Sequence, residues 1–197
     1  MNYSLIILNK KNITDFAKER NGLLKKAKND WVFFIDSDET ISNFHDKVGS
    51  SFPISNQFSS YQFLRKNYFL GSYVGTDKII RLVKKGTGTW ERAVHEVWTP
   101  NDKSKVGDIN EEIIHNTADN LKDYLDKINN YSTLHALANN KEGKKSTLLK
   151  IIFYPLLKFI QTLFKSRHGV FSLMQAFHSF LSWSKLWIIQ TKRNYKQ

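Results

Sequence analysis

Apolar and polar positions follow two different periods in the first forty residues. Residues 13–27 place apolar side chains at helical spacing and end in a basic turn, which predicts an amphipathic helix. Residues 31–35 are continuously apolar and run directly into the acidic residues 36–39. Such a run is typical of a strand buried on both faces of a parallel sheet. A helix that leads into a buried strand predicts an α/β fold.

Two further strands and a second helix are predicted downstream. Residues 61–69 and 78–83 are rich in aromatic and β-branched residues and flank a Gly-containing turn, as paired strands do. Residues 119–140 return to helical periodicity. Between them, residues 90–98 hold aromatic anchors among clustered titratable side chains. The pattern predicts a mixed sheet flanked by helices.

Charge divides the chain at a linker, residues 141–145. Residues 1–140 carry 19 basic and 17 acidic side chains, whereas residues 141–197 carry 11 basic side chains and one acidic side chain. We therefore interpret residues 1–140 as an α/β domain and residues 141–197 as a basic, amphipathic helical extension. The chain has no cysteine, which excludes disulfides, thiolate metal sites and cysteine nucleophiles.

The apolar content of the extension indicates its partner. Nucleic acid and anionic lipid both attract a basic segment, but residues 148–164 and 171–189 are dense in large apolar side chains, which is atypical of nucleic-acid-binding arms. Lys150 and Lys158 interrupt the first run, so it falls short of the roughly 18–20 uncharged residues that span a bilayer. We expect a cytoplasmic protein that associates peripherally with the inner membrane surface and binds no nucleic acid. The alternative is two core helices.

Two acidic residues follow the buried strand. Side chains two positions apart in an extended segment point the same way, so Asp36 and Asp38 are able to face one cation. Open α/β sheets bind ligands beyond the carboxyl ends of their strands. Carboxylates at that position suit Mg²⁺ or Mn²⁺ whose coordination is completed by substrate phosphates. The pattern favours a metal–diphosphate site over a solvated acidic loop.

The order of these motifs resembles family 2 glycosyltransferases, in which a helix with Arg-Asn precedes a hydrophobic strand that ends in Asp-x-Asp. Later segments are similar to the branch that adds glucose to the lipopolysaccharide inner core. The resemblance runs from about residue 13 to the end. Its segments are DFAKERN (15–21), DWVFFIDSDE (30–39), RLV (81–83), Trp90, VHE (94–96), IHNT (114–117) and YLDKINNYS (124–132).

The resemblance implies a GT-A-like, Rossmann-like fold, a nucleotide-diphospho sugar donor, a divalent metal (Mg²⁺ or Mn²⁺) and inversion at the anomeric carbon. On matching positions, Asp38 binds the metal, Asp36 binds the metal or the donor ribose, and Arg20 and Asn21 support the nucleotide pocket. His115 is the candidate for a late histidine that completes the metal site, or else a turn histidine. The implied reaction moves a hexose, with glucose favoured, to a lipopolysaccharide-core or other lipid-linked glycan acceptor.

Inversion requires a general base for the acceptor hydroxyl, and a carboxylate is the usual type. The Val-His-Glu segment resembles the acceptor-side motif of the family, so Glu96 is the first candidate and Glu91 the second. Trp90 and Trp98 are candidates for stacking on a sugar of the acceptor, and His95 for orienting the glutamate or binding the acceptor. The alternatives are surface ion pairs for the glutamates and a structural role for the histidine.

The beginning of the chain departs from the family. Its members open with a strand and loop that grip the nucleotide, with a Tyr-Asn-Glu pattern, but only residues 3–8 precede the first matching helix. We therefore expect the N-terminal nucleotide-binding strands to be missing. Two other interpretations stay open. The first is a non-catalytic peripheral membrane protein. The second is a haloacid-dehalogenase-like phosphatase, because residues 34–40 also resemble the first motif of that family.

Overall fold

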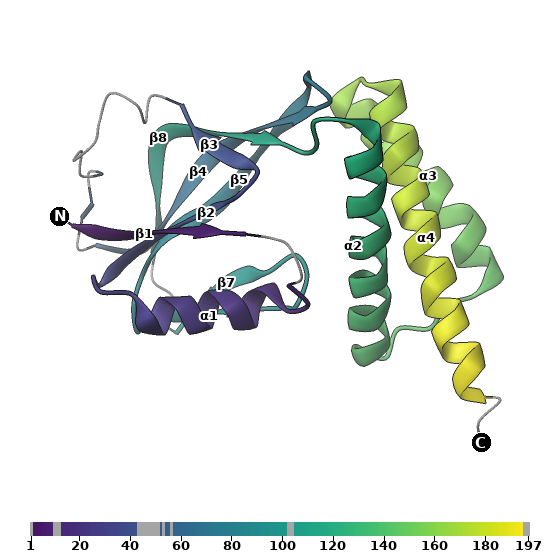
Figure 1. Cartoon of the computed structure of the whole chain (residues 1–197), viewed down its shortest axis with the longest axis horizontal. Coiled ribbons are helices and arrows are strands. Elements are labelled where there is room, and N and C mark those ends of the chain that lie inside the picture. Colours follow the sequence, from purple (N-terminus) through teal and green to yellow (C-terminus); the bar gives the residue numbers. More distant parts are fainter. Residues whose placement is uncertain are drawn as a thin grey trace. The chain divides into compact units, whose positions relative to one another are not determined.

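The chain forms two compact units in the computed structural model. Unit 1 contains Met1–Tyr68 and Thr76–Thr117, and unit 2 contains Phe69–Gly75 and Ala118–Gln197. Figure 1 shows that unit 1 holds the strands and one helix, and that the other helices follow in unit 2. The structure describes residues 2–9, 13–42, 52, 54–55, 57–101 and 105–194.

A β-α-β element opens unit 1. β1 (Tyr3–Leu8) and β2 (Trp31–Asp36) are parallel neighbours along their whole length, and α1 (Phe16–Lys26) connects them. The side chain of Asp15 caps α1 by accepting a hydrogen bond from the amide of Lys18, which satisfies one of the unpaired donors at a helix start. Every residue of β2 is buried, as the apolar run predicts.

The remaining strands complete a mixed sheet. They are β3 (Glu39–Ile41), β4 (Phe58–Phe69), β5 (Ser72–Lys84) and β8 (Lys105–Asn116). In the described part of the chain the strand order is β1-β2-β5-β4-β8-β3 (Figure 1). β2 pairs antiparallel with β5, β4 parallel with β8, and β3 antiparallel with β8. This confirms the predicted α/β class and is compatible with a Rossmann-like arrangement, while the GT-A topology stays a prediction.

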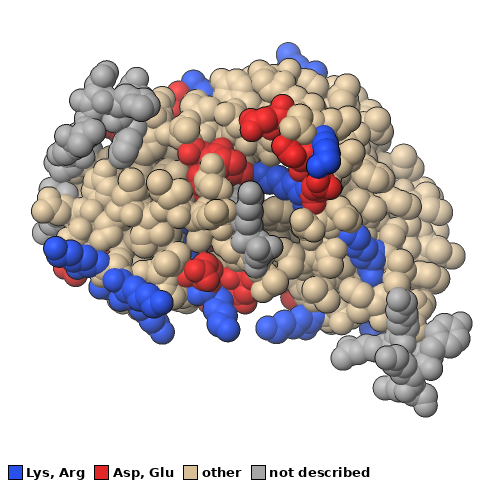
Figure 2. Space-filling view, in the orientation of Figure 1, with Lys and Arg blue, Asp and Glu red and all other residues tan. Residues whose placement is uncertain are grey.

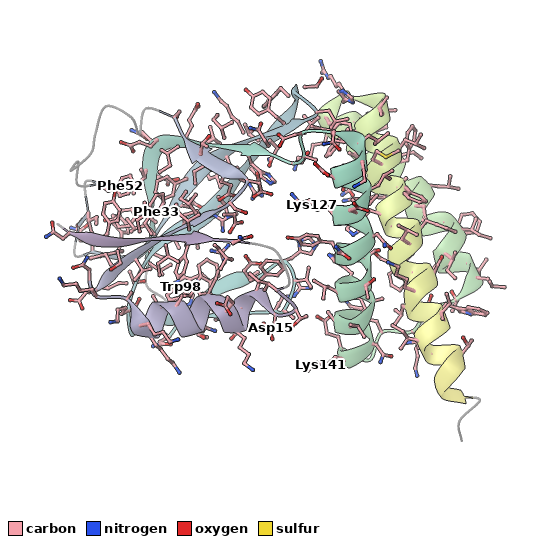
Figure 3. The ribbon with its side chains drawn as sticks, in the orientation of Figure 1. Asp15, Phe33, Phe52, Trp98, Lys127 and Lys141 are labelled. Atoms are coloured by element: carbon pink, nitrogen blue, oxygen red, sulfur yellow. The ribbon has the colours of Figure 1, made fainter. Side chains whose placement is uncertain are left out.

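Apolar clusters cover both faces of β2. Alternate side chains of a strand point to opposite faces, so Phe33 joins one cluster and Phe34 the other. The first cluster includes Phe52, whose ring lies 5.1 Å from that of Phe33 (Figure 3). The second lies between the sheet and α1 and includes Trp98 (Figure 3). The strand that ends in the acidic run is therefore fixed from both sides.

A short hairpin lies on α1. β6 (Gly88–Glu91) pairs antiparallel with β7 (Val97–Pro100). The side chain of Asn21 on α1 accepts a hydrogen bond from the Trp90 amide at 2.9 Å and donates one to the Trp90 carbonyl at 2.8 Å. The amide group of Asn21 thus pairs with the edge of β6 as a neighbouring strand would.

Unit 2 is mainly helical. α2 (Leu121–Lys141), α3 (Leu148–Ser166) and α4 (Gly169–Asn194) follow one another, and α4 contacts both of the others. The division between the units follows Thr117, whereas the linker composition predicts a boundary within residues 141–145. The linker instead separates two helices of the same unit, because α2 packs on α4.

Unit 2 also includes the turn between β4 and β5. Phe69, at the end of β4, is 2% exposed, and its ring lies 4.9 Å from that of Tyr124 and 5.3 Å from that of Phe171. Val74 and Ile128 complete this cluster. The tip of a long hairpin therefore belongs to the core of the helical unit.

α3 exposes most of its large apolar side chains. Within this helix, all of which is described, only Thr162 is buried. Figure 2 shows few charged side chains over the region where Figure 1 places α3 and α4. None of the helices in the described ranges combines the length and the apolarity needed to cross a membrane. The exposed large hydrophobic residues of α3 are Leu148, Leu149, Ile152, Phe153, Tyr154, Leu156, Leu157, Ile160, Leu163 and Phe164.

Replacing Gly88 by alanine should destabilise unit 1. The added Cβ would lie 2.6 Å from the carbonyl oxygen of Thr99 and from the ring of Trp98, and overpacking of this kind costs about 1–3 kcal/mol. Gly22→Ala is the matched control, because its added Cβ has no described atom within 4 Å and lies inside α1. It should stabilise by roughly 0.5–1 kcal/mol. Urea unfolding measures both changes, and changes of the same sign would contradict the packing of β6 on β7.

Candidate functional site

The acidic run that follows β2 divides between the interior and the surface. Asp36 and Glu39 are 3% and 5% exposed, whereas the side chain of Asp38 is 21% exposed. The turn between them is held against β1, because the Ser37 amide donates a hydrogen bond to the Leu8 carbonyl at 2.9 Å. Asp36 and Glu39 are therefore interior residues, whereas Asp38 is accessible to solvent.

Asp36 is neutralised by two buried arginines. Nη2 of Arg20 lies 2.6 Å from Oδ1 of Asp36, and Nη2 of Arg81 lies 2.8 Å from Oδ2. Each carboxylate oxygen thus accepts a charge-assisted hydrogen bond, the stronger kind. Asp36 is turned to the interior, although the sequence predicts that it faces one cation together with Asp38. This burial also argues against a phosphatase nucleophile at Asp36, since a nucleophile has to reach its substrate.

Glu39 extends these contacts to a third arginine. Arg81 donates from Nε to Oε2 of Glu39 at 3.0 Å and from Nη2 to Oε1 at 2.6 Å, and Arg65 donates from Nη1 to Oε1 at 3.1 Å. Burial raises the pKa of Glu39, but the nearby arginines outweigh it and hold that pKa below its ordinary value. We call Arg20, Arg65, Arg81, Asp36 and Glu39 the buried ion network.

Asp38 faces His115 beside this network. Nε2 of His115 lies 3.3 Å from Oδ2 of Asp38, and Nδ1 lies 2.8 Å from Oδ1 of Asn67. Asn67 in turn donates from Nδ2 to Oδ1 of Asp77 at 2.7 Å. Strand pairing explains the meeting, because His115 on β8 is the register partner of Asn67 on β4 and of Glu39 on β3.

The donor set of this pair fits a divalent ion that substrate would complete. Asp38 offers a carboxylate oxygen and His115 an imidazole nitrogen, and Mg²⁺ and Mn²⁺ accept few protein ligands when phosphates supply the rest. Among the described residues no group of three His, Cys, Asp or Glu side chains is arranged to hold a metal. The described residues would thus supply two ligands, Asp38 and His115, because the oxygens of Asp36 are engaged by arginines.

Arg20 joins the acidic run to the first candidate base. Its Nε donates to Oε1 of Glu96 at 3.0 Å, while its Nη2 binds Asp36. The guanidinium lies over the rings of Phe34 and Trp90, 5.3 Å and 5.1 Å from their centroids. Glu96, whose side chain is 16% exposed, stands at the boundary between the network and solvent. Arg20 is buried and binds Asp36 and Glu96. A direct contact between Arg20 and a nucleotide therefore stays a prediction.

The turn between β6 and β7 carries backbone strain. Arg92 and His95 have φ values of 72° and 55°, a left-handed conformation that costs a non-glycine residue roughly 1–2 kcal/mol. The amide of Phe16 holds the turn by donating to the Ala93 carbonyl at 3.0 Å. His95 and Glu91 are exposed. Strain of this kind is often found at functional sites.

Trp90 and Trp98 belong to the interior. Each is 4% exposed, and their ring centroids are 5.5 Å apart. Both pack in the cluster between α1 and the sheet. Asn21, the remaining predicted donor residue, holds the backbone of Trp90. In this arrangement the two rings serve the core, and a sugar stacked on either ring stays a prediction.

Local sequence patterns assign no role to several residues of the site. Arg65, Arg81 and Glu39 are three of the five members of the buried ion network, and Asn67 and Asp77 support His115. One signal was present in the sequence: Arg81 interrupts the apolar run 79–83, where an isolated charge in a buried strand needs a partner. The roles of Asn67 and Asp77 depend on strand register and had no local signal.

Two curated proteins named as glycosyltransferases are similar to this chain. The lipopolysaccharide core biosynthesis glycosyltransferase LpsC of Rhizobium meliloti (strain 1021) is 23% identical over 188 residues, covering 87% of this chain and 69% of that protein. An uncharacterized glycosyltransferase of Rickettsia bellii (strain RML369-C) is 26% identical over 185 residues, covering 81% of this chain and 62% of that protein. No family model matches the chain. These similarities support a relationship to glycosyltransferases, and the chain spans about two thirds of each relative.

Replacing Glu39 by glutamine should weaken the fold and flatten its dependence on pH. The folded pKa of Glu39 lies below its ordinary value of 4.5, so its ionised form stabilises fully above about pH 4.5 and progressively less as the pH falls toward the folded pKa. Breaking a buried ion pair costs about 3–5 kcal/mol at neutral pH. Thermal unfolding between about pH 3 and pH 7 measures both effects.

Glu112→Gln is the control for that measurement. Glu112 pairs with Lys66 at 2.7 Å, but both side chains are about one third exposed, and such pairs contribute roughly 0–1 kcal/mol. Its stability should follow the wild-type curve at every pH. If Glu39→Gln were as stable as wild type and lost stability in acid equally, the buried ion network would not have the proposed strength.

Proposed function

We propose that this chain carries the centre of an inverting, metal-dependent glycosyltransferase that moves a hexose from a nucleotide-diphospho sugar to an acceptor hydroxyl. The observation that carries the proposal is the meeting of Asp38 and His115 at the end of β2, in a chain similar to two glycosyltransferases. The donor sugar, with glucose favoured, follows from the sequence resemblance.

The donor side depends on a fixed Asp38. Asp36 and Glu39 flank it and are locked to arginines from α1, β4 and β5, so the turn between them presents Asp38 without reorganisation when substrate arrives. Asp38 and His115 would hold a divalent ion. When bound, that ion would supply charge stabilisation for the departing diphosphate, which gains negative charge in the transition state.

The acceptor side depends on Glu96. Arg20 holds one of its carboxylate oxygens at 3.0 Å, which orients the group at the edge of the strained turn. In the proposed reaction Glu96 takes the proton of the acceptor hydroxyl as its oxygen attacks the anomeric carbon. The bond between that carbon and the diphosphate breaks on the opposite face, which inverts the configuration. Glu91, on the exposed end of β6, is the second candidate for this role.

The proposed acceptor is the lipopolysaccharide core or another lipid-linked glycan, as the name of the Rhizobium meliloti relative suggests. Such acceptors lie at a membrane, and α3 is suited to that surface. It exposes Leu157 and Phe164 at 60% and 82%, and residues 143–197 contain ten basic side chains and no acidic one. Exposed apolar patches with basic neighbours favour an anionic lipid interface. We propose that the chain associates with a membrane through this surface, and that it does so at the cytoplasmic face.

Asp38→Asn should abolish Mn²⁺-dependent binding of the donor. Calorimetric titration with UDP-glucose, with and without Mn²⁺, measures this, and UDP alone separates nucleotide binding from sugar recognition. Asp108→Asn is the matched control, because Asp108 is an exposed strand residue paired with Lys78 and Gln62. It should bind like wild type. Equal Mn²⁺-dependent binding by Asp38→Asn and wild type would contradict the metal assignment.

The same preparation tests the base. Glu96→Gln keeps an oxygen that accepts the hydrogen bond from Arg20, so donor affinity should stay within about twofold while transfer falls by at least 10²-fold, the usual loss for a general base. Transfer that survives in Glu96→Gln but not in Glu91→Gln would reassign the base. A folded wild-type chain that binds no donor but binds lipid would favour the non-catalytic membrane protein.

Replacing Leu157 and Phe164 by glutamine should release the chain from anionic vesicles. Burial of a Leu or Phe side chain is worth about 1.5–3 kcal/mol, so each replacement should weaken binding about tenfold or more. Vesicle flotation measures the bound fraction. Leu137→Gln is the control, because Leu137 is 51% exposed on α2 and should behave as wild type. Unchanged flotation of the double variant would contradict the proposal, and a dimer that the double variant abolishes would reassign the surface to self-association.

A further inference from the structure

The orientation of the Asn67 amide is fixed by its neighbour Asp77. The carboxylate of Asp77 only accepts hydrogen bonds when ionised, and Arg65 grips it from Nε at 3.1 Å and from Nη2 at 2.7 Å. Burial raises the pKa of Asp77, but the hydrogen bonds and charge of Arg65 outweigh it and hold that pKa below its ordinary value. Asp77 is therefore an acceptor at neutral pH. The nitrogen of Asn67 has to face it, as the 2.7 Å contact shows.

The same logic fixes the proton on His115. With its nitrogen committed to Asp77, Asn67 turns its carbonyl oxygen to Nδ1 of His115 at 2.8 Å. An amide oxygen only accepts, so Nδ1 has to carry a hydrogen. In the neutral ring, Nε2 then presents a lone pair, and it lies 3.3 Å from Oδ2 of Asp38. Two electron-rich atoms at this separation attract positive charge, which either a proton on Nε2 or a bound cation supplies.

We propose that Asn67 and Asp77 are positioning residues that hold His115 in the Nδ1–H tautomer, so that Nε2 and Asp38 together face a divalent cation. The inference that a cation binds here rests on the proposed function, whereas the inference about the tautomer of His115 does not. Hydrogen bonding at one ring nitrogen commonly orients a histidine whose other nitrogen binds a metal. Here the hydrogen bonds continue from the His115 ring through Asn67 and Asp77 to Arg65. Arg65 also binds Glu39 at 3.1 Å, so the ring is connected to the buried ion network.

Asn67→Val removes the acceptor and suits a strand. His115 should then shift toward the Nε2–H tautomer, which donates to Asp38 and withdraws the lone pair from any metal. The matched control is Gln62→Val on the same strand, because Gln62 also donates to a carboxylate, Asp108, at 3.1 Å, at a position that is not the register partner of His115.

Two measurements separate this inference from the proposed function. Long-range ¹H–¹⁵N correlation spectra of the metal-free protein, at about pH 8.5 where an ordinary histidine with a pKa near 6.5 is neutral, report the tautomer of His115. Electron paramagnetic resonance titration of Mn²⁺, with UDP present, reports metal affinity. Asn67→Val should weaken Mn²⁺ binding by about 10–100-fold, while Gln62→Val should leave both readouts at wild-type values.

The outcomes are distinct. A wild-type Nδ1–H tautomer that Asn67→Val loses and Gln62→Val keeps, with the expected drop in Mn²⁺ affinity in Asn67→Val alone, supports the proposal. A wild-type Nε2–H tautomer, or an Nδ1–H tautomer unchanged in Asn67→Val, overturns it. If the tautomer behaves as expected but wild type binds no Mn²⁺, the positioning role is supported and the metal site of the proposed function is overturned.

Discussion

The buried ion network is the constraint on which the rest of unit 1 depends. Its charges come from five different elements, α1, β2, β3, β4 and β5. Taking an ion out of water costs several kcal/mol even after relaxation, and that cost is offset only when every partner is in place. A shift of any one element would leave a charge unpaired in the interior. Electrostatics therefore specifies the mutual position of these elements more narrowly than apolar packing alone, which tolerates volume-conserving exchange.

This constraint explains the different environments of two neighbouring aspartates. Asp36 belongs to the network and is withdrawn from solvent, while Asp38 lies two residues on, in a turn that the network and the Ser37 amide hold in place. Asp36 contributes to the rigidity of the interior, and Asp38 is the aspartate to which we assign the proposed chemistry. A catalytic group on a rigid support needs less reorganisation during reaction, which is a main source of enzymatic rate enhancement. The similarity to glycosyltransferases gives this division of roles its proposed purpose.

Local sequence patterns predicted the elements better than the site. The apolar run 31–35 and the helical spacing of 13–27 suffice to place β2 and α1, because each element shows its own period. The pairing of His115 with Asn67 depends on which strands are neighbours, across 48 positions of sequence, and no local period encodes that choice. Trp90 and Trp98 show a second limit, since an aromatic residue beside titratable groups has the same pattern whether its ring is buried or exposed. Burial is a property of the assembled cluster.

The tip of the β4–β5 hairpin gives the chain an unusual division. The polypeptide passes between the units after Tyr68, after Gly75 and after Thr117. A gene shortened after Thr117 would lose Tyr124, Ile128 and Phe171, and it would leave the apolar Phe69 and Val74 without the cluster that covers them. The helical unit is therefore not a cassette that recombination can add or remove at one junction. An exchange of either unit that keeps both units folded therefore has to respect three junctions at once.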